Sequence, residues 1–168
     1  TLFDALESGT DIFHFAGHGY FNGDSGQILL DNPDHSASAY YDASDLAHLM
    51  IGVKLAVLGA CESGQASGEN IWGGVAQALV QAGVAAVVGS QFRLEDRNAA
   101  PLNKQLYRGV LAGDTVDESV SNARRAIRNL SGLENRDWGA LVLYLRVEDG
   151  VIFPREHSAA LDLSPIPR

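Results

Sequence analysis

The sequence predicts an α/β domain in which a mainly parallel sheet is flanked by helices. Three observations support this class. Short apolar runs alternate along the chain with longer segments of helical periodicity. The central run, residues 55–60 of a strand predicted over 54–60, is apolar apart from Gly59, as is typical of a parallel strand buried on both faces. The 168 residues, 46% of them hydrophobic, are enough for one domain with a substantial core.

The first third of the chain is expected to contain a helix end, two strands and a second helix. Near-helical spacing of apolar residues indicates a helix end before residue 8. An Ile- and Phe-rich strand is then expected at residues 11–16, a turn at 22–26 and a short strand at 27–30. A polar, poorly ordered loop is expected at 32–41. Asp42 is a suitable N-cap for a helix that ends near Met50.

The rest of the chain continues the alternation of strands and helices. After the central strand the expected elements are loop 62–69, helix 71–82, strand 84–90, charged loop 91–98, a helix to 111, helix 116–130 and strand 138–147. Asn70 can cap the first of these helices and Gly83 ends it. Pro101 suits the first turn of the next helix.

Charge and cysteine content exclude several classes of protein. A net charge of −9 argues against nucleic acid and anionic membrane surfaces as partners. The single cysteine excludes an internal disulfide and a Cys-rich zinc site, and it fits a reducing compartment. The sequence has neither a spanning apolar run nor a signal-peptide pattern, so we expect a soluble, cytoplasmic protein.

Two reactive side chains each follow a predicted buried strand. His18 comes after the first strand and Cys61 after the central one. Sequential strands are usually neighbours, so the two side chains are expected to meet at one sheet edge. An imidazole that takes the thiol proton produces a thiolate able to attack a carbonyl carbon. The backbone N–H groups of Gly19 and Cys61 are candidates for holding the resulting oxyanion.

Both segments around these residues resemble those of caspase-type cysteine peptidases. Residues 13–19 read Phe-His-Phe-Ala-Gly-His-Gly, and residues 59–64 read Gly-Ala-Cys-Glu-Ser-Gly. The similarity is greatest to CHAT domains, caspase-like domains that are related to separase and often attached to tetratricopeptide repeats. It covers roughly residues 10–147 and includes Ser90-Gln91-Phe92, Asp96, Leu106-Tyr107 and residues 123–126. It implies a caspase-like, three-layer fold over residues 1–153, without its N-terminal part, and a C-terminal tail over 154–168.

The resemblance also implies an activity. The expected function is cleavage of protein substrates by a Cys-His dyad, with His18 as base and Cys61 as nucleophile. No cofactor or metal is expected, and regulation by a tetratricopeptide-repeat region or a partner protein is implied. Glu95 or Asp96, after the third parallel strand, could bind an Arg or Lys side chain of the substrate. The alternative is that both acids are solvated or pair with Arg93 or Arg97.

Other interpretations of the same residues stay open. Cys61 could be an inert, small apolar residue, or the nucleophile of an α/β-hydrolase elbow, although the histidine would then be expected downstream. A metal site shared by His14 and His18 is disfavoured, because four residues of a strand span about 13 Å. We expect His14 instead to be a structural residue with a buried hydrogen bond. The main rival function is a catalytically inactive, caspase-like interaction domain.

Overall fold

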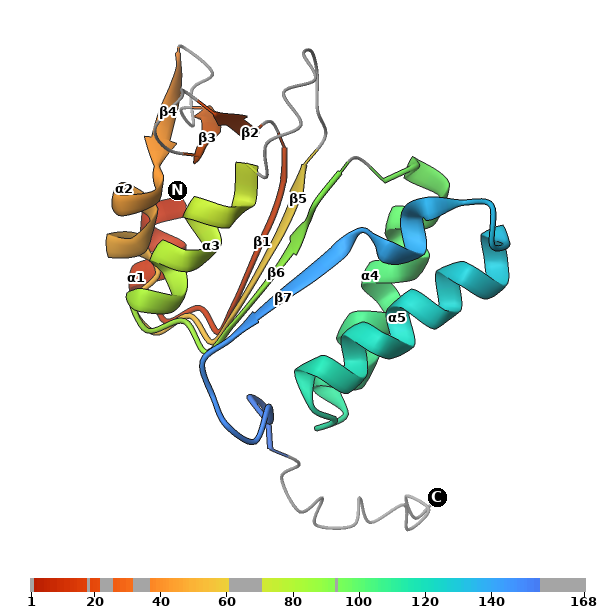
Figure 1. Cartoon of the computed structure of the whole chain (residues 1–168). Coiled ribbons are helices and arrows are strands. Elements are labelled where there is room, and N and C mark those ends of the chain that lie inside the picture. The colour runs from red at the N-terminus through yellow and green to blue at the C-terminus, as the bar shows by residue number, and fades with distance from the viewer. Residues whose placement is uncertain are drawn as a thin grey trace, which may run out of the picture.

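The central sheet has four strands in the order β1-β5-β6-β7 (Figure 1). The computed structural model describes residues 2–17, 19–21, 26–31, 37–60, 71–92 and 94–154. The strands are β1 (Ile12–Gly17), β5 (Leu55–Ala60), β6 (Ala86–Ser90) and β7 (Leu141–Leu145). The first three run parallel and β7 is antiparallel to β6. This mainly parallel sheet confirms the predicted fold class.

Helices cover both faces of this sheet and complete three layers (Figure 1). On one side lie α1 (Leu2–Glu7), α2 (Ala43–Leu49) and α3 (Ile71–Gln81). On the other lie α4 (Asp96–Leu111) and α5 (Val116–Ser131). None of the described helices has the length and apolar character that a membrane span requires.

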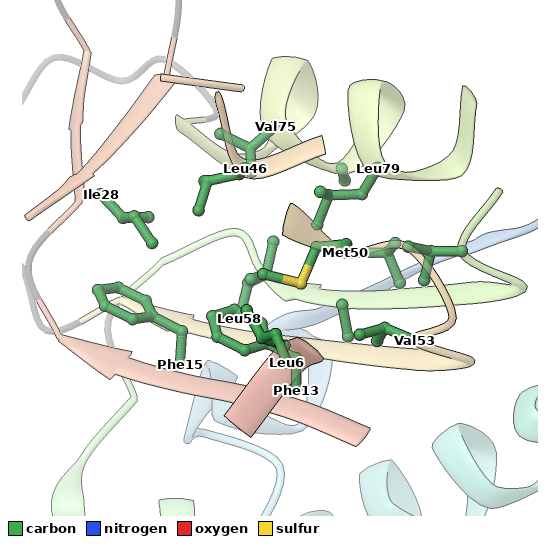
Figure 2. Packing of buried hydrophobic residues seen from close by; sticks show 14 residues of the cluster. Leu6, Phe13, Phe15, Ile28, Leu46, Met50, Val53, Leu58, Val75 and Leu79 are labelled. Atoms are coloured by element: carbon green, nitrogen blue, oxygen red, sulfur yellow. The ribbon is translucent and has the colours of Figure 1, made fainter. Parts of the chain in front are cut away.

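Alternation along the strands divides the buried side chains into two cores, because successive side chains of a strand point to opposite faces. Figure 2 shows the first core, where Phe13 and Phe15 of β1 and Leu58 of β5 pack with residues of α1, α2 and α3. In the second core, Leu55 and Val57 of β5 face α4 and α5. The contributions of these two helices are Leu102, Leu106, Val110, Val116, Val120, Ala123 and Ile127. Their spacing of three or four residues is that of an amphipathic helix.

A second sheet of three antiparallel strands lies beside the first core. It consists of β2 (Gly19–Phe21), β3 (Gly26–Asp31) and β4 (Ser38–Asp42). The prediction of a poorly ordered loop was wrong for residues 38–41, because pairing with β3 makes this polar segment a strand. The predicted N-cap is confirmed, since the Asp42 carboxylate accepts hydrogen bonds from the backbone N–H groups of Ser44 and Asp45.

Two further boundaries differ from the predictions. α4 begins at Asp96, so Pro101 lies in its interior rather than in its first turn. Proline has no backbone N–H, so the helix lacks the hydrogen bond that this residue would donate. Packing of the helix must offset that loss. The predicted strand 138–147 begins instead at Leu141, after the short 3₁₀ helix η1 (Arg136–Gly139). The proposed cap Asn70 and the loop 62–69 lie outside the described residues.

Helices α4 and α5 pack tightly against each other at Gly109. A Cβ atom at this position would lie 2.4 Å from the Oγ and 3.0 Å from the Cβ of Ser119. Ser119 is fully buried, and its hydroxyl donates to the Thr115 carbonyl, 2.8 Å away. The absence of a side chain at Gly109 therefore permits the packing of the two helices that cover the second core.

Gly109→Ala should lower the free energy of unfolding. Overpacking costs about 1–3 kcal/mol, and the better helix propensity of alanine returns about 1 kcal/mol. We expect a net loss of up to about 2 kcal/mol in urea unfolding. Gly139→Ala is the matched control, because a Cβ there would meet no atom of the described residues within 4 Å. Equal stability of the two variants would contradict this account of the helix contact.

Candidate functional site

The paired ends of β1 and β5 bring the two predicted catalytic segments together. The strands are parallel and in register from Ile12–Leu55 to Gly17–Ala60. His18 and Cys61 are the residues that follow these paired ends in the sequence. Both lie outside the described residues. Gly19 is described and opens β2, where it pairs with Ile28.

A pocket lies directly before these strand ends, on the face covered by α4. The sheet forms the floor of the pocket, and the floor residues fall into two rows. Each row consists of residues that are register partners on neighbouring strands. The inner row is His14, Val57 and Val88, and the outer row is Ala16, Gly59, Ser90 and Leu141. Its wall includes Leu94 and, on α4, Asp96, Ala99 and Asn103. The volume is about 80 Å³, room for one side chain or several waters, since one water needs about 10–15 Å³.

The outer row is open because two of its residues are small. Ala16 and Gly59 are direct partners across β1 and β5. Among the described residues, a Cβ at Gly59 would meet one atom within 4 Å, the Phe15 carbonyl oxygen at 3.4 Å, which is an ordinary contact. The space above Gly59 therefore belongs to the pocket and not to the packed interior.

The inner row carries a polar pair, His14 and Tyr107. The Nδ1 atom of His14 lies 2.6 Å from the Tyr107 hydroxyl oxygen. Burial lowers the pKa of His14 and raises the pKa of Tyr107 to about 12, because desolvation disfavours the charged form of each group. Both side chains are therefore neutral at pH 7. The predicted hydrogen bond of His14 is present, but the side chain is partly exposed rather than buried.

The structure distinguishes the two acids proposed to bind substrate. Asp96 lines the pocket. Glu95 has its carboxylate occupied by other side chains, with the Arg97 Nε atom 2.5 Å from Oε2 and the Asn135 Nδ2 atom 3.1 Å from Oε1. The predicted alternative, pairing with Arg97, is thus observed for Glu95. Asp96 is the acid that a ligand in this pocket would meet.

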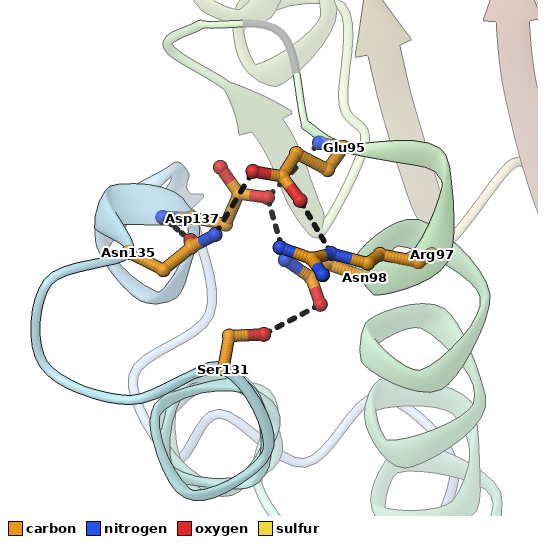
Figure 3. A network of polar contacts seen from close by, with 6 residues as sticks. All are labelled: Glu95, Arg97, Asn98, Ser131, Asn135 and Asp137. Atoms are coloured by element: carbon orange, nitrogen blue, oxygen red, sulfur yellow. Dashed lines mark hydrogen bonds and ion pairs between the residues drawn. The ribbon is translucent and has the colours of Figure 1, made fainter.

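A polar network holds the first turn of α4, and sequence reasoning missed it (Figure 3). Asp137 of η1 is almost fully buried, and its Oδ2 atom accepts from the Glu95 backbone N–H (2.9 Å) and the Asn98 amide (2.8 Å). Asn98, which is completely buried, accepts from the Ser131 hydroxyl at 2.7 Å. The Glu95 side chain makes no capping hydrogen bond, and Asp137 instead holds the start of α4 through the Glu95 backbone N–H and the Asn98 side chain. The network fixes the backbone from which Asp96 projects.

Two further contacts, both involving Phe92, hold the segment between β6 and α4 in place. The Ser90 hydroxyl donates to the Phe92 carbonyl, 2.6 Å away, and the Arg136 guanidinium lies 4.7 Å from the centre of the Phe92 ring. Within the described ranges, no three His, Cys, Asp or Glu side chains gather in a way that could hold a metal ion.

The α/β fold, with a mainly parallel sheet flanked by helices, is consistent with a caspase-like domain. The family model of the CHAT domain matches residues 1–146, so the chain belongs to the CHAT-domain family. No curated protein sequence matches the chain.

The lowered pKa of His14 should make folding stability depend on pH. The unfolded chain takes up the His14 proton near pH 6.5, whereas the folded chain does so only at lower pH. Stability should therefore fall as the pH drops below about 6.5, because the unfolded state then binds more protons. Unfolding of His14→Gln, compared with that of the unmodified chain between about pH 7.5 and pH 5, should show a smaller loss. Identical pH profiles would contradict the shift.

Proposed function

We propose that this domain is a cysteine endopeptidase that cleaves protein substrates through a dyad of His18 and Cys61. The register pairing of Gly17 with Ala60 carries this proposal, together with membership of the CHAT-domain family. His18 and Cys61 follow these two register partners directly in the sequence. The proposal places their side chains at the same edge of the sheet, close enough for the imidazole to take the thiol proton.

The proposed chemistry uses this chain's residues alone. His18 accepts the proton of the Cys61 thiol, and the thiolate adds to the scissile carbonyl carbon. The backbone N–H groups of Gly19 and Cys61 stabilise the charge that develops on the carbonyl oxygen. His18 then donates its proton to the leaving amine, and water releases the acyl group from sulfur. These steps require no metal or cofactor.

The pocket beside the dyad is proposed to hold the substrate side chain that precedes the scissile bond. Ala16 and Gly59, at its outer row, come two residues before His18 and Cys61. The remaining lining is largely apolar and can pack against the aliphatic part of a long side chain. The Asp96 carboxylate favours a cation, so the expected residue is arginine or lysine.

We propose that the domain acts in the cytoplasm, because its single cysteine fits a reducing compartment. We also propose, from the resemblance to CHAT domains, that an attached tetratricopeptide-repeat region or a partner protein controls it. The acidic chain, with a net charge of −9, supports protein rather than nucleic acid or membrane as its target.

Labelling with acyloxymethyl ketone probes tests the dyad. The probe should carry arginine, with aspartate and leucine probes for comparison. We expect the arginine probe to label the chain, and labelling to disappear in Cys61→Ala and His18→Ala, because one variant lacks the nucleophile and the other lacks the base. Labelling is measured by intact mass. Absence of labelling by every probe, in a folded chain that still binds a partner, would favour the inactive interaction domain instead.

Asp96→Asn should change selectivity for charge. The loss of a charge-assisted contact should lower kcat/KM for an arginine peptide by about tenfold or more, and leave a leucine peptide almost unchanged. Glu95→Gln is the matched control, since the neighbouring carboxylate is bonded to Arg97 and Asn135 and lies outside this pocket (Figure 3). If both variants kept the full preference for arginine, Asp96 would have no role in recognition.

A further inference from the structure

β7 is an edge strand of the central sheet, and one side of its backbone faces away from that sheet. The strand order ends at β7, which is the outermost strand in Figure 1. The Arg146 N–H, directly after β7, donates to the carbonyl oxygen of Ala85, directly before β6. In an antiparallel pair, the backbone groups of successive residues point alternately toward and away from the partner strand. The backbone N–H and C=O groups of Leu141, Leu143 and Leu145 therefore point outward.

This outer edge lacks the usual protection against the addition of another strand. β7 reads Leu-Val-Leu-Tyr-Leu, without proline, glycine or charge. Edge strands are commonly blunted by lysine, proline or a bulge, because unpaired N–H and C=O groups can pair with another chain. Burial decreases along β7 from the buried Leu141 to Leu145, whose exposed fraction is 38%. In the part of the chain that the structure describes, the outward groups of Leu143 and Leu145 make no hydrogen bond.

A cation lies at the start of this edge. The Nη2 atom of Arg124, on α5, donates to the outward carbonyl oxygen of Leu141, 2.5 Å away. Its Nε atom is buried and has no hydrogen-bond partner among the described residues. No described carboxylate forms an ion pair with this half-buried side chain. A guanidinium that has lost part of its hydration is stabilised when a carboxylate binds it, so Arg124 is suited to an acidic ligand.

Two more arginines flank the edge. Arg128 lies one helical turn beyond Arg124 on α5, and Arg146 follows the last residue of β7. Neither forms an ion pair with a residue that the structure describes. The whole chain has a net charge of −9, so these three cations beside one strand reverse the overall charge locally. Charge complementarity therefore favours a negatively charged partner at this edge.

An extended acidic segment satisfies both features of the edge. Its backbone can pair with the outward groups of Leu143 and Leu145, whereas a helix has already used its own N–H and C=O groups. Alternate side chains of an added strand lie on the face that α5 covers. A glutamate on that face can accept hydrogen bonds from the guanidinium of Arg124. A second copy of this chain is disfavoured, because two paired β7 edges would bring the arginines of both copies together.

We propose that the outer edge of β7, with Arg124 at its start, is a docking site for an extended acidic segment of a partner protein, which adds to the central sheet as a further strand. The site is separate from the proposed dyad, because β6 and β5 lie between β7 and β1 in the sheet. The inference does not depend on peptidase activity. It gives a partner a way to bind the domain from outside the substrate pocket.

Two peptides that differ in one charge test the inference. The probes are acetyl-Thr-Val-Thr-Glu-Thr-Val-Thr-amide and the same peptide with glutamine in place of glutamate, since β-branched residues favour a strand. In an NMR titration of the isotopically labelled full chain, we expect saturable shifts of the Leu143 and Leu145 amide resonances. The Val142 and Tyr144 amides should move little, because they face β6. The glutamate peptide should bind about tenfold more tightly than the glutamine peptide.

Arg124→Gln isolates the contribution of the cation. It keeps a donor for the Leu141 carbonyl oxygen and removes the positive charge, so the two peptides should then bind with nearly equal affinity. Arg125→Gln is the matched control. It makes the same change at the next residue of α5, where the guanidinium binds the Asn122 side chain and not β7. This control should keep the preference of about tenfold for the glutamate peptide.

Leu145→Pro isolates the contribution of the backbone. Its N–H points outward, so proline removes a group that makes no bond to β6, and edge strands tolerate proline at such positions. Both peptides should bind about tenfold more weakly to this variant. A glutamate peptide with all its backbone amides N-methylated gives the same test on the unmodified chain. It keeps the charge but has no N–H to donate, so it should not bind.

The possible outcomes are distinct. If Arg124 only caps the strand edge, neither peptide will shift the Leu143 and Leu145 amides, and the inference is wrong. Equal binding of the two peptides to the unmodified chain, or full binding of the N-methylated peptide, would also overturn it. A doubled mass in light scattering, with the same amides shifting on concentration alone, would assign the edge to a second copy.

The result is independent of the proposed function. Cys61 labelling reports on the dyad, whereas the peptide titration reports on β7. A chain that is labelled but binds neither peptide would be a peptidase without this docking site. A chain that binds the glutamate peptide but resists every labelling probe would be an interaction domain that uses this edge.

Discussion

The parallel pairing of β1 with β5 is the constraint on which the rest of the molecule depends. It begins where the backbone N–H groups of Lys54 and Leu55 both donate to the Asp11 carbonyl oxygen. From there it continues in register to Gly17 and Ala60. One set of hydrogen bonds thus aligns the two segments proposed to carry the chemistry, sets the two rows of the pocket floor and divides the core between its faces. A slip of one residue would exchange these faces.

Local patterns in the sequence were sufficient for most of the fold. The apolar run before Cys61 identified β5, and the Asp42 cap identified the start of α2. The errors arose where distant parts of the chain determine the structure. β4 is polar and is a strand because β3 pairs with it. The start of α4 depends on the Asp137 carboxylate, which lies 42 residues beyond Glu95.

In the candidate site, the prediction that the two strands are neighbours is confirmed. The meeting of His18 and Cys61 at the strand ends stays a prediction, because both lie outside the described residues. The pocket was not predictable, because its polar inner end joins His14 to Tyr107 across 93 residues. Adjacent acids could not be distinguished either. Glu95 and Asp96 have similar chemistry, and only the helix geometry directs one to the pocket and the other to Arg97 and Asn135.

The small residues of the outer row have a consequence for how such a domain could diversify. A side chain added at Gly59 would extend into the open pocket, since the Phe15 carbonyl oxygen is the one neighbour that its Cβ would meet in the part of the chain that the structure describes. Larger residues there would shorten the pocket while the hydrogen bonds of β5 and the packing of both cores stayed as they are. Single substitutions could then change which side chain the pocket accepts, with little loss in the free energy of unfolding. A directed-evolution library at this position would sample such changes in an otherwise unchanged scaffold.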